Sequence, residues 1–128
     1  MQFYHCEVCD NLAGMIHDSG VVPVCCDEVM KSLVANTVDA SHEKHLPVVT
    51  ISSDERETRV LVQVGSVPHP MTKEHLIEWI FIETNKGRHR RALVADDAPT
   101  ASFLLIQGEL PTAVYAYCNL HGLWKTAL

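Results

Sequence analysis

Four cysteines lie within the first 26 residues of this 128-residue chain, and they limit strongly what this part can fold into. Cys6 and Cys9 are separated by two residues, and the adjacent pair Cys25 and Cys26 follows after a further fifteen residues. The segment 1–36 is too short to bury enough apolar surface to fold by itself. A metal site made of the four thiolates is therefore expected to form its core.

The spacing of these cysteines does not identify the metal. A Cys-x-x-Cys turn presents two thiolates to one tetrahedral ion. Adjacent cysteines are unusual in such sites because their side chains point apart, so we expect a distorted tetrahedron. Four thiolates suit zinc and iron equally well. Without a metal, the pair Cys25 and Cys26 would be open to oxidation.

The composition of the whole chain indicates a folded domain and limits its partners. Apolar residues make up 47% of the chain and charged residues 20%, which is enough for a packed core. The net charge of -6 argues against nucleic acid or an anionic membrane as the main partner. No apolar run reaches membrane-spanning length and residues 1–5 lack a signal-peptide layout, so we expect a cytoplasmic protein. Its five cysteines are then expected to be metal ligands or reactive thiols, not disulfides.

After a polar connector at 37–44, the sequence takes on the pattern of β-strands. Alternation is clearest at 58–64, where Val60, Val62 and Val64 share one face. No stretch has the periodicity of an amphipathic helix. Further strands are expected at 47–51, 76–83, 88–95, 101–107 and 112–118, with Asn85-Lys86-Gly87 as a hairpin turn. Six or seven strands favour an all-β fold, an immunoglobulin-like β-sandwich spanning 37–128 and following an N-terminal metal module at 1–36.

Four histidines and one cysteine fall at expected junctions between loops and strands. They are His45, His69, His75, Cys118 and His121. Because a sandwich gathers its loops at its ends, these side chains are candidates for a second metal site. Taken singly, each histidine is explained as well by a structural or solvent-facing role, and Cys118 by packing as a small apolar residue. The remaining histidines, His5, His17, His42 and His89, are expected at the surface.

The motifs of the chain, taken together and in order, resemble those of the desulfoferrodoxins, the two-iron class of superoxide reductase. The resemblance covers essentially the full length. The motifs are Cys6-x-x-Cys9, Cys25-Cys26, Glu43-Lys44-His45-x-Pro47, Gly65-Ser66-Val67-x-His69-Pro70-Met71, His75-x-Ile77-Glu78-Trp79 and Cys118-Asn119-Leu120-His121-Gly122.

This resemblance implies two iron ions per chain. The first would be a rubredoxin-like (desulforedoxin-like) Fe(Cys)4 centre held by Cys6, Cys9, Cys25 and Cys26. The second would be the catalytic iron in the sandwich, with four equatorial imidazoles and an axial thiolate. Its implied ligands are His45, His69, His75, His121 and Cys118. Because zinc prefers four ligands, five donors also favour a redox metal on chemical grounds.

The resemblance further implies a reaction and its partners. The family reduces superoxide to hydrogen peroxide with electrons from a small donor such as rubredoxin, and its members are usually homodimers. Lys44 would guide the superoxide anion and organise the water that delivers protons, and Glu43 would help expel the product. Without the family, Glu43 and Lys44 would be interpreted as a solvated loop pair. Trp79, Trp124 and Tyr117 would be interpreted as core residues.

Two other functions are compatible with the residues alone. One is an electron carrier whose sandwich metal is closed to substrate. The other is an interaction module clipped by one zinc ion, with a sheet edge that binds a protein. Metal content separates the zinc module from the enzyme, and reactivity toward superoxide separates the carrier from the enzyme.

Overall fold

The computed structural model describes residues 1–128 and divides into two compact units, Met1–Val34 and Ala35–Leu128. The division falls two residues before the boundary expected from the sequence. The one helix has four residues, and no helix has the length and apolar character needed to cross a membrane.

The first unit consists of short antiparallel strands around a very small core. Tyr4, Cys6 and Met30 form a buried cluster, and Phe3 is also buried. β3 is only two residues long and includes the ligand candidate Cys25. The first sheet has the order β2-β1-β5, and β3 pairs with β4. The strands are β1 (Phe3–His5), β2 (Leu12–Gly14), β3 (Val24–Cys25), β4 (Glu28–Val29) and β5 (Lys31–Leu33).

The second unit is a two-sheet β-sandwich with a single helical turn, and it confirms the expected fold class. One sheet has the order β10-β7-β6 and the other β12-β11-β8-β9, with all pairs antiparallel. The elements are α1 (His42–His45), β6 (Pro47–Ser53), β7 (Glu57–Val64), β8 (Ile77–Thr84), β9 (Arg88–Ala92), β10 (Thr100–Ile106), β11 (Pro111–Cys118) and β12 (Gly122–Ala127).

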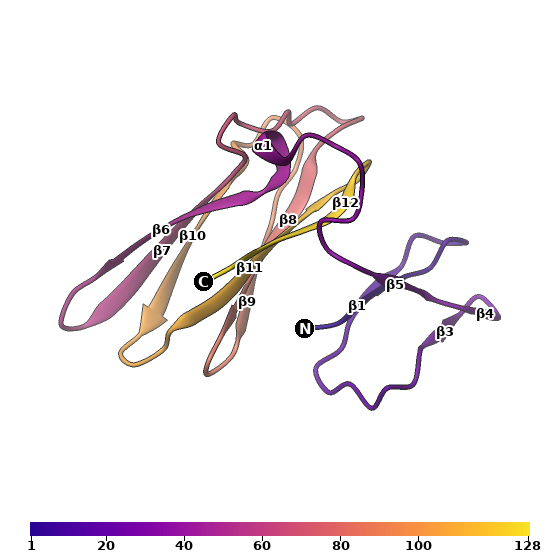
Figure 1. Ribbon diagram of the computed structural model, residues 1–128, viewed down its shortest axis with the longest axis horizontal. Helices are drawn as coiled ribbons and strands as arrows, with labels where there is room; N and C mark the ends of the chain where they lie inside the picture. The colour runs from indigo at the N-terminus through magenta and orange to yellow at the C-terminus, as the bar shows by residue number, and fades with distance from the viewer. The chain divides into compact units, whose positions relative to one another are not determined.

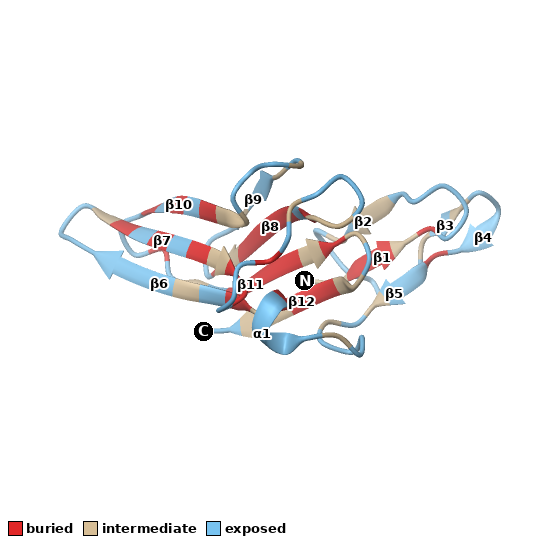
Figure 2. Ribbon diagram, turned by 90° about the horizontal axis from the view of Figure 1, so that it is seen from above, coloured by how far each residue is buried: buried red, intermediate tan, exposed pale blue.

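The core of the sandwich follows from the alternation along its strands. Figure 2 shows buried and exposed residues alternating along β7 and β10. The three valines of β7 face inward and are fully buried, as the sequence predicts. Opposite them lie Ile80 and Ile82 of β8 and Val114 of β11, and Cys118 at the end of β11 belongs to the same cluster. The buried face of β11 therefore ends at Cys118, which is a candidate metal ligand.

The two ends of the sandwich differ in their connections (Figure 1). At one end, the turns β6–β7, β8–β9 and β10–β11 close the hairpins. At the other end lie α1 and the loops before β8 and between β11 and β12. All five candidate ligands of the sandwich belong to this second end, so the strand connections alone bring them to one side.

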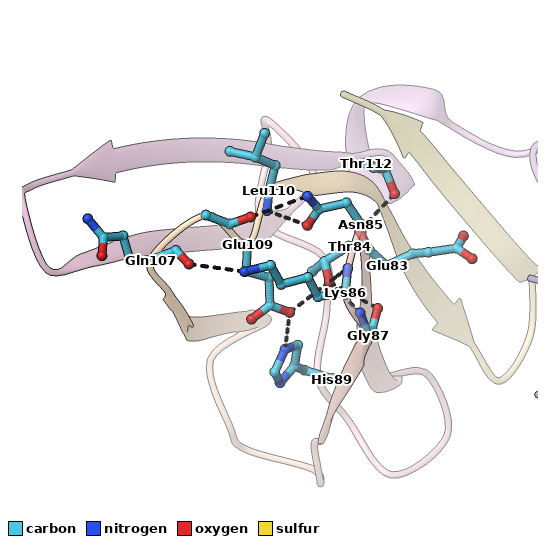
Figure 3. Close-up of polar contacts among 11 residues, drawn as sticks. Glu83, Thr84, Asn85, Lys86, Gly87, His89, Gln107, Glu109, Leu110 and Thr112 are labelled. Carbon is cyan, nitrogen blue, oxygen red and sulfur yellow. Dashed lines mark hydrogen bonds and ion pairs between the residues drawn. The ribbon is translucent and has the colours of Figure 1, made fainter.

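The hairpin end is held by a buried carboxylate, shown in Figure 3. Glu109 is 5% exposed and accepts a hydrogen bond of 2.7 Å from the hydroxyl of Thr84. The same carboxylate oxygen lies 3.0 Å from Nε2 of His89. His89 therefore has a fixed bonding partner, although 40% of its side chain remains exposed. Thr84, His89 and Glu109, here called the Glu109 cluster, tie the β8–β9 turn to the β10–β11 turn.

Candidate metal centres

The four histidines of the sandwich form a closed ring. Neighbouring imidazoles, in the order His45, His69, His75 and His121, have centroids 4.6–4.9 Å apart. Each neighbouring pair is nearly perpendicular, with interplanar angles of 73–89°. The diagonal between His45 and His75 is longer, at 6.2 Å. Four rings arranged in this way turn one nitrogen each toward a shared centre.

Two of these rings are oriented by main-chain carbonyl groups. Nδ1 of His45 lies 2.7 Å from the carbonyl oxygen of Ser41, and Nδ1 of His69 lies 2.6 Å from that of Pro70. Because a carbonyl can only accept, each Nδ1 carries the proton and each neutral ring keeps its lone pair on Nε2. An imidazole whose outer nitrogen donates to a carbonyl in this way is the usual form of a metal-bound histidine.

Cys118 completes the set from the side of the core. Its thiol is fully buried, and Sγ lies 3.7 Å from Nδ1 of His121. Burial raises the pKa of this thiol, although the N–H groups of Leu120 and His121 act against the rise. A thiolate at this position therefore needs a nearby cation. The donor atoms of the five residues all lie within 4.8 Å of one another.

Three of the ring histidines, His45, His69 and His75, have pKa values lowered by their surroundings. Burial lowers the pKa of His69 to about 4, against the opposing effect of its bond to Pro70. Burial also lowers the pKa values of His45 and His75, and the nearby Lys44 ammonium adds to this effect at both rings. Neutral imidazole is the form that binds metal ions. The lowered pKa values of His45, His69 and His75 thus favour the binding of a cation by the ring.

A close backbone contact sets the distance between His45 and His69. The N–H of Gly65 donates to the carbonyl of Leu46 at 3.1 Å, and the N–H of Val67 donates to that of Glu43 at 3.2 Å. Gly65 has φ of +84°, and a Cβ there would lie 2.2 Å from the Val67 carbonyl oxygen. Only glycine permits this approach. The loop that carries His69 is thereby held against α1, which carries His45.

Asn119 supports the site, although its sequence position gives no sign of this role. It accepts a hydrogen bond of 2.9 Å from the N–H of Leu76 and donates one of 3.0 Å to the carbonyl of Glu74. It thereby ties the Cys118 loop to the loop that carries His75. A side chain at a turn, bonded to a distant loop, leaves no periodic signal that could be detected in the sequence.

Trp124 has a structural role beside the ring. It is fully buried and stacks on His45, with centroids 4.8 Å apart and an interplanar angle of 23°. Its Nε1–H donates to the carbonyl of His121 at 3.1 Å. Trp79 and Tyr117, by contrast, stack on each other at 5.4 Å. Trp124 thus contacts a ring histidine, and Trp79 and Tyr117 contact each other.

Glu43 and Lys44 lie in α1, immediately before His45. Both side chains are exposed, and the carbonyl of Glu43 also accepts a hydrogen bond of 3.2 Å from the hydroxyl of Ser66. The sequence places these residues in a connector without a helix. The helical turn fixes Lys44 near the ring, which is why its charge acts on His45 and His75.

The four cysteines of the first unit also come together. Their sulfur atoms all lie within 4.8 Å of one another. The adjacent thiols of Cys25 and Cys26 are 4.0 Å apart, so they do not point apart as expected. The reason is the backbone of Cys26, whose φ of +52° turns its side chain back toward the cluster. This conformation is uncommon outside glycine, asparagine and aspartate.

Cys6 and Cys26 of this cluster have pKa values shifted in opposite directions. Hydrogen bonds from the backbone N–H groups of Cys9 and Val8 lower the pKa of Cys6 to about 7. Contacts with Cys9 and Cys25 raise the pKa of Cys26 to about 12. Repulsion between close thiolates thus opposes full ionisation in the absence of a cation. A metal ion at the centre would remove this repulsion and would add to a core that has very few buried residues.

The residues of both clusters fit metal ions. In the sandwich, Nε2 of His69 and of His75 is buried without a hydrogen-bond partner, although such groups are normally paired. A bound ion would satisfy both atoms. Four imidazoles and one thiolate exceed the four ligands that zinc prefers and suit iron. Fold and site thus define a β-sandwich protein with a group of four histidines and one cysteine that suits iron, preceded by a four-cysteine module.

Comparison with known proteins supports the same class of protein. The family model described as Desulfoferrodoxin matches residues 37–127. A desulfoferrodoxin of Syntrophotalea carbinolica is 43% identical over 126 residues, covering 98% of this chain and 95% of that protein. A superoxide reductase of Pyrococcus abyssi is 33% identical and covers 68% of this chain and 87% of its own length. The crystal structure of the superoxide reductase from Treponema pallidum has a TM-score of 0.80 at 38% identity, covering 98% of this chain and 97% of that one.

The chain belongs to the desulfoferrodoxin family. The family has two iron sites, and the two side-chain clusters described above match that number.

Proposed function

We propose that the protein is a superoxide reductase that converts superoxide to hydrogen peroxide at the sandwich site. The observation that carries this proposal is the ring of His45, His69, His75 and His121 with Cys118 beside it. In balanced form, one superoxide anion takes up one electron and two protons and gives one hydrogen peroxide. Bound iron would supply the single electron through a change of oxidation state.

The ligand set explains why iron would be held in a reactive form. The five protein donors would hold iron while leaving room on it for a small ligand. Neutral imidazoles add no charge, so Fe(II) with the single thiolate of Cys118 keeps a net positive charge that favours an anion. The thiolate of Cys118 would donate electron density to a bound iron, as a thiolate does in some haem enzymes.

Lys44 and Glu43 are the proposed catalytic residues outside the ligand set. The exposed ammonium of Lys44 would attract superoxide to the site of an otherwise acidic protein and would order the water that brings protons. Its effect on the pKa values of His45 and His75 supports a position near the ring. The carboxylate of Glu43 would assist the departure of peroxide.

The first unit is proposed to bind a second iron through Cys6, Cys9, Cys25 and Cys26, so that 1–36 acts as a desulforedoxin-like module and 37–128 as the catalytic domain. We further propose a cytoplasmic homodimer that receives its electrons from a small rubredoxin-like protein. A free thiol cluster supports a reducing compartment. Sedimentation would test the dimer.

Reaction of the reduced protein with superoxide tests the function directly. The protein, loaded with about two irons per chain, is expected to give about one peroxide per superoxide and no dioxygen. Half as much peroxide, together with dioxygen, would instead identify a dismutase. An electron carrier with a closed site would give neither product at a fast rate, and one zinc ion without iron would identify an interaction module.

A further inference from the structure

β9 is an edge strand with an unusual concentration of positive charge. It pairs only with β8, at the end of the order β12-β11-β8-β9. Arg88, Arg90 and Arg91 are exposed on it, and Lys86 precedes them in the turn. The segment 86–91 thus carries four of the ten lysines and arginines in a chain of net charge -6. Positive charge is gathered at one sheet edge.

A groove runs along this edge between the two sheets. It has a volume of about 480 Å³ and lies between β9 and β10, which is the edge strand of the other sheet. Three arginines line it together with the polar Ser102 and the exposed Leu104. The arginines are Arg59, Arg90 and Arg91.

Most charged groups around the groove already have a partner, but two arginines do not. Arg59 lies 3.4 Å from Glu57, and Arg88 lies 3.6 Å from Glu83. The carboxylate of Glu109 is already bonded to Thr84 and His89. No carboxylate of the chain lies within ion-pair distance of Arg90 or Arg91. Lys86 has no carboxylate partner either, but its Nζ donates to the carbonyl of Gln107 at 3.2 Å. Arg90 and Arg91 are therefore the charged groups of the edge that have no bonded partner.

The register of β9 places the two free arginines on opposite faces of its sheet. Arg91 pairs with Ile80, which faces the core, and Arg90 pairs with Phe81 on the other face. The unpaired N–H and C=O groups of the strand lie between them. A second copy of the chain cannot pair with this edge favourably, because arginine would oppose arginine. An acidic partner is favoured by the same charges.

The same strand leads toward the metal ring. Ala92 at its end pairs with Trp79, Trp79 pairs with Tyr117, and Tyr117 precedes the ligand Cys118. With strands about 4.8 Å apart, the end of β9 lies two strands, or about 10 Å, from Cys118. A protein bound at this edge would thus approach the thiolate side of the ring.

We propose that the β9 edge, through Arg90 and Arg91, is the docking surface for an acidic electron-carrier protein. This inference rests on the proposed function, because each superoxide reduced removes one electron that an external donor must replace. The donor gives up one electron, and the ferric site takes it up and becomes ferrous. Charge attraction across the groove raises the rate of encounter and loses strength as salt screens it.

The test measures the reduction of the ferric holoprotein by a reduced, acidic rubredoxin in anaerobic stopped-flow experiments. Arg90→Gln combined with Arg91→Gln is expected to lower the second-order rate about tenfold at low ionic strength, with a smaller difference at physiological salt. Arg56→Glu is the matched control. Arg56 lies in the exposed β6–β7 turn. Its replacement by glutamate lowers the net charge of the chain by two units, as the two arginine-to-glutamine changes do together. This control is expected to keep a rate near that of the unmodified protein.

A second measurement separates docking from catalysis. The ferrous forms of both variants are expected to react with superoxide as fast as the unmodified protein does. If the unmodified protein fails to reduce superoxide, the proposed function is wrong, whatever the rubredoxin rates show. If the double variant keeps the full rubredoxin rate, or loses no more than Arg56→Glu loses, the docking proposal is wrong. Self-association of the double variant with an unchanged rubredoxin rate would show that these arginines only prevent edge pairing.

Discussion

Gly65→Ala is expected to empty the sandwich metal site, because Gly65 sets the distance between His45 and His69. A Cβ at this position would lie 2.2 Å from the carbonyl oxygen of Val67 and 2.7 Å from that of Lys44. Both obstacles are backbone atoms, so no side-chain rotation relieves the overlap. To reach an ordinary contact of 3.4 Å, the Val67 carbonyl would have to move by 1.2 Å, the difference between the two distances.

The expected cost of this substitution has two parts. A non-glycine residue in the left-handed region costs about 1–2 kcal/mol. Displacement of packed backbone adds about 1–3 kcal/mol, as for other overpacked sites. We therefore expect unfolding free energy to fall by about 2–5 kcal/mol. A shift of this size also exceeds the roughly 0.5 Å within which a metal or catalytic site must be held.

Gly108→Ala provides the matched control within the same unit. Gly108 has φ of +74°, close to the +84° of Gly65, but a Cβ there would meet only the flexible end of Lys86 at 3.3 Å. The unfolding free energy of Gly108→Ala is expected to fall only by the cost of placing alanine in the left-handed backbone conformation. Urea denaturation and iron content per chain are the measurements. If Gly65→Ala were no less stable than Gly108→Ala and kept its sandwich iron, the steric reasoning would be refuted.

Four further substitutions test individual roles. Lys44→Ala should keep the iron but slow the reaction with superoxide and weaken its dependence on salt, as measured by pulse radiolysis at several ionic strengths. Cys118→Ser should remove the thiolate donor and abolish peroxide formation in the superoxide assay. Cys9→Ser should empty only the N-terminal site, and metal analysis should then find about one iron per chain. Glu109→Gln should make stability less sensitive to acid, as seen in urea denaturation at a series of pH values. Bonds from Thr84 and His89 lower the pKa of Glu109, so its stabilising contribution is present above about pH 4.5 and is lost as the pH falls through the folded pKa.

Each of these expectations has a clear contrary result. Loss of iron in the Lys44 variant would show a structural role for that side chain. Peroxide formation by the Cys118 variant would exclude the thiolate as an essential donor. Loss of both irons in the Cys9 variant would show that the two sites are not independent. An unchanged acid profile for the Glu109 variant would mean that this carboxylate does not contribute to acid unfolding.

The strands of the sandwich were largely predictable, because alternation follows directly from one buried face. The observed β7, Glu57–Val64, differs by one residue from the expected 58–64. β12 has no clear strand signal in the sequence, since Leu123 and Trp124 are adjacent and both buried, which breaks the alternation. α1 was missed because a single turn is too short to show helical periodicity.

The candidate ligands were predictable as residue types at junctions, whereas their arrangement was not. Local sequence places His45 and His121 in separate loops, and 76 positions separate them, yet their ring nitrogens lie 2.9 Å apart. Only the pairing of the sheets brings such distant loops together. Similarly, no pattern in Cys25-Cys26 reveals the positive φ that turns the second thiol inward.

The carbonyl groups that orient His45 and His69 belong to the main chain, and this has a consequence for how the site can vary. Replacing the side chain of Ser41 leaves its carbonyl oxygen in place, so the proton on Nδ1 of His45 is fixed by the path of the chain and not by residue identity. Relatives can therefore differ at this position without altering ring chemistry. A designer who transfers the five ligands to another scaffold must transfer this path as well.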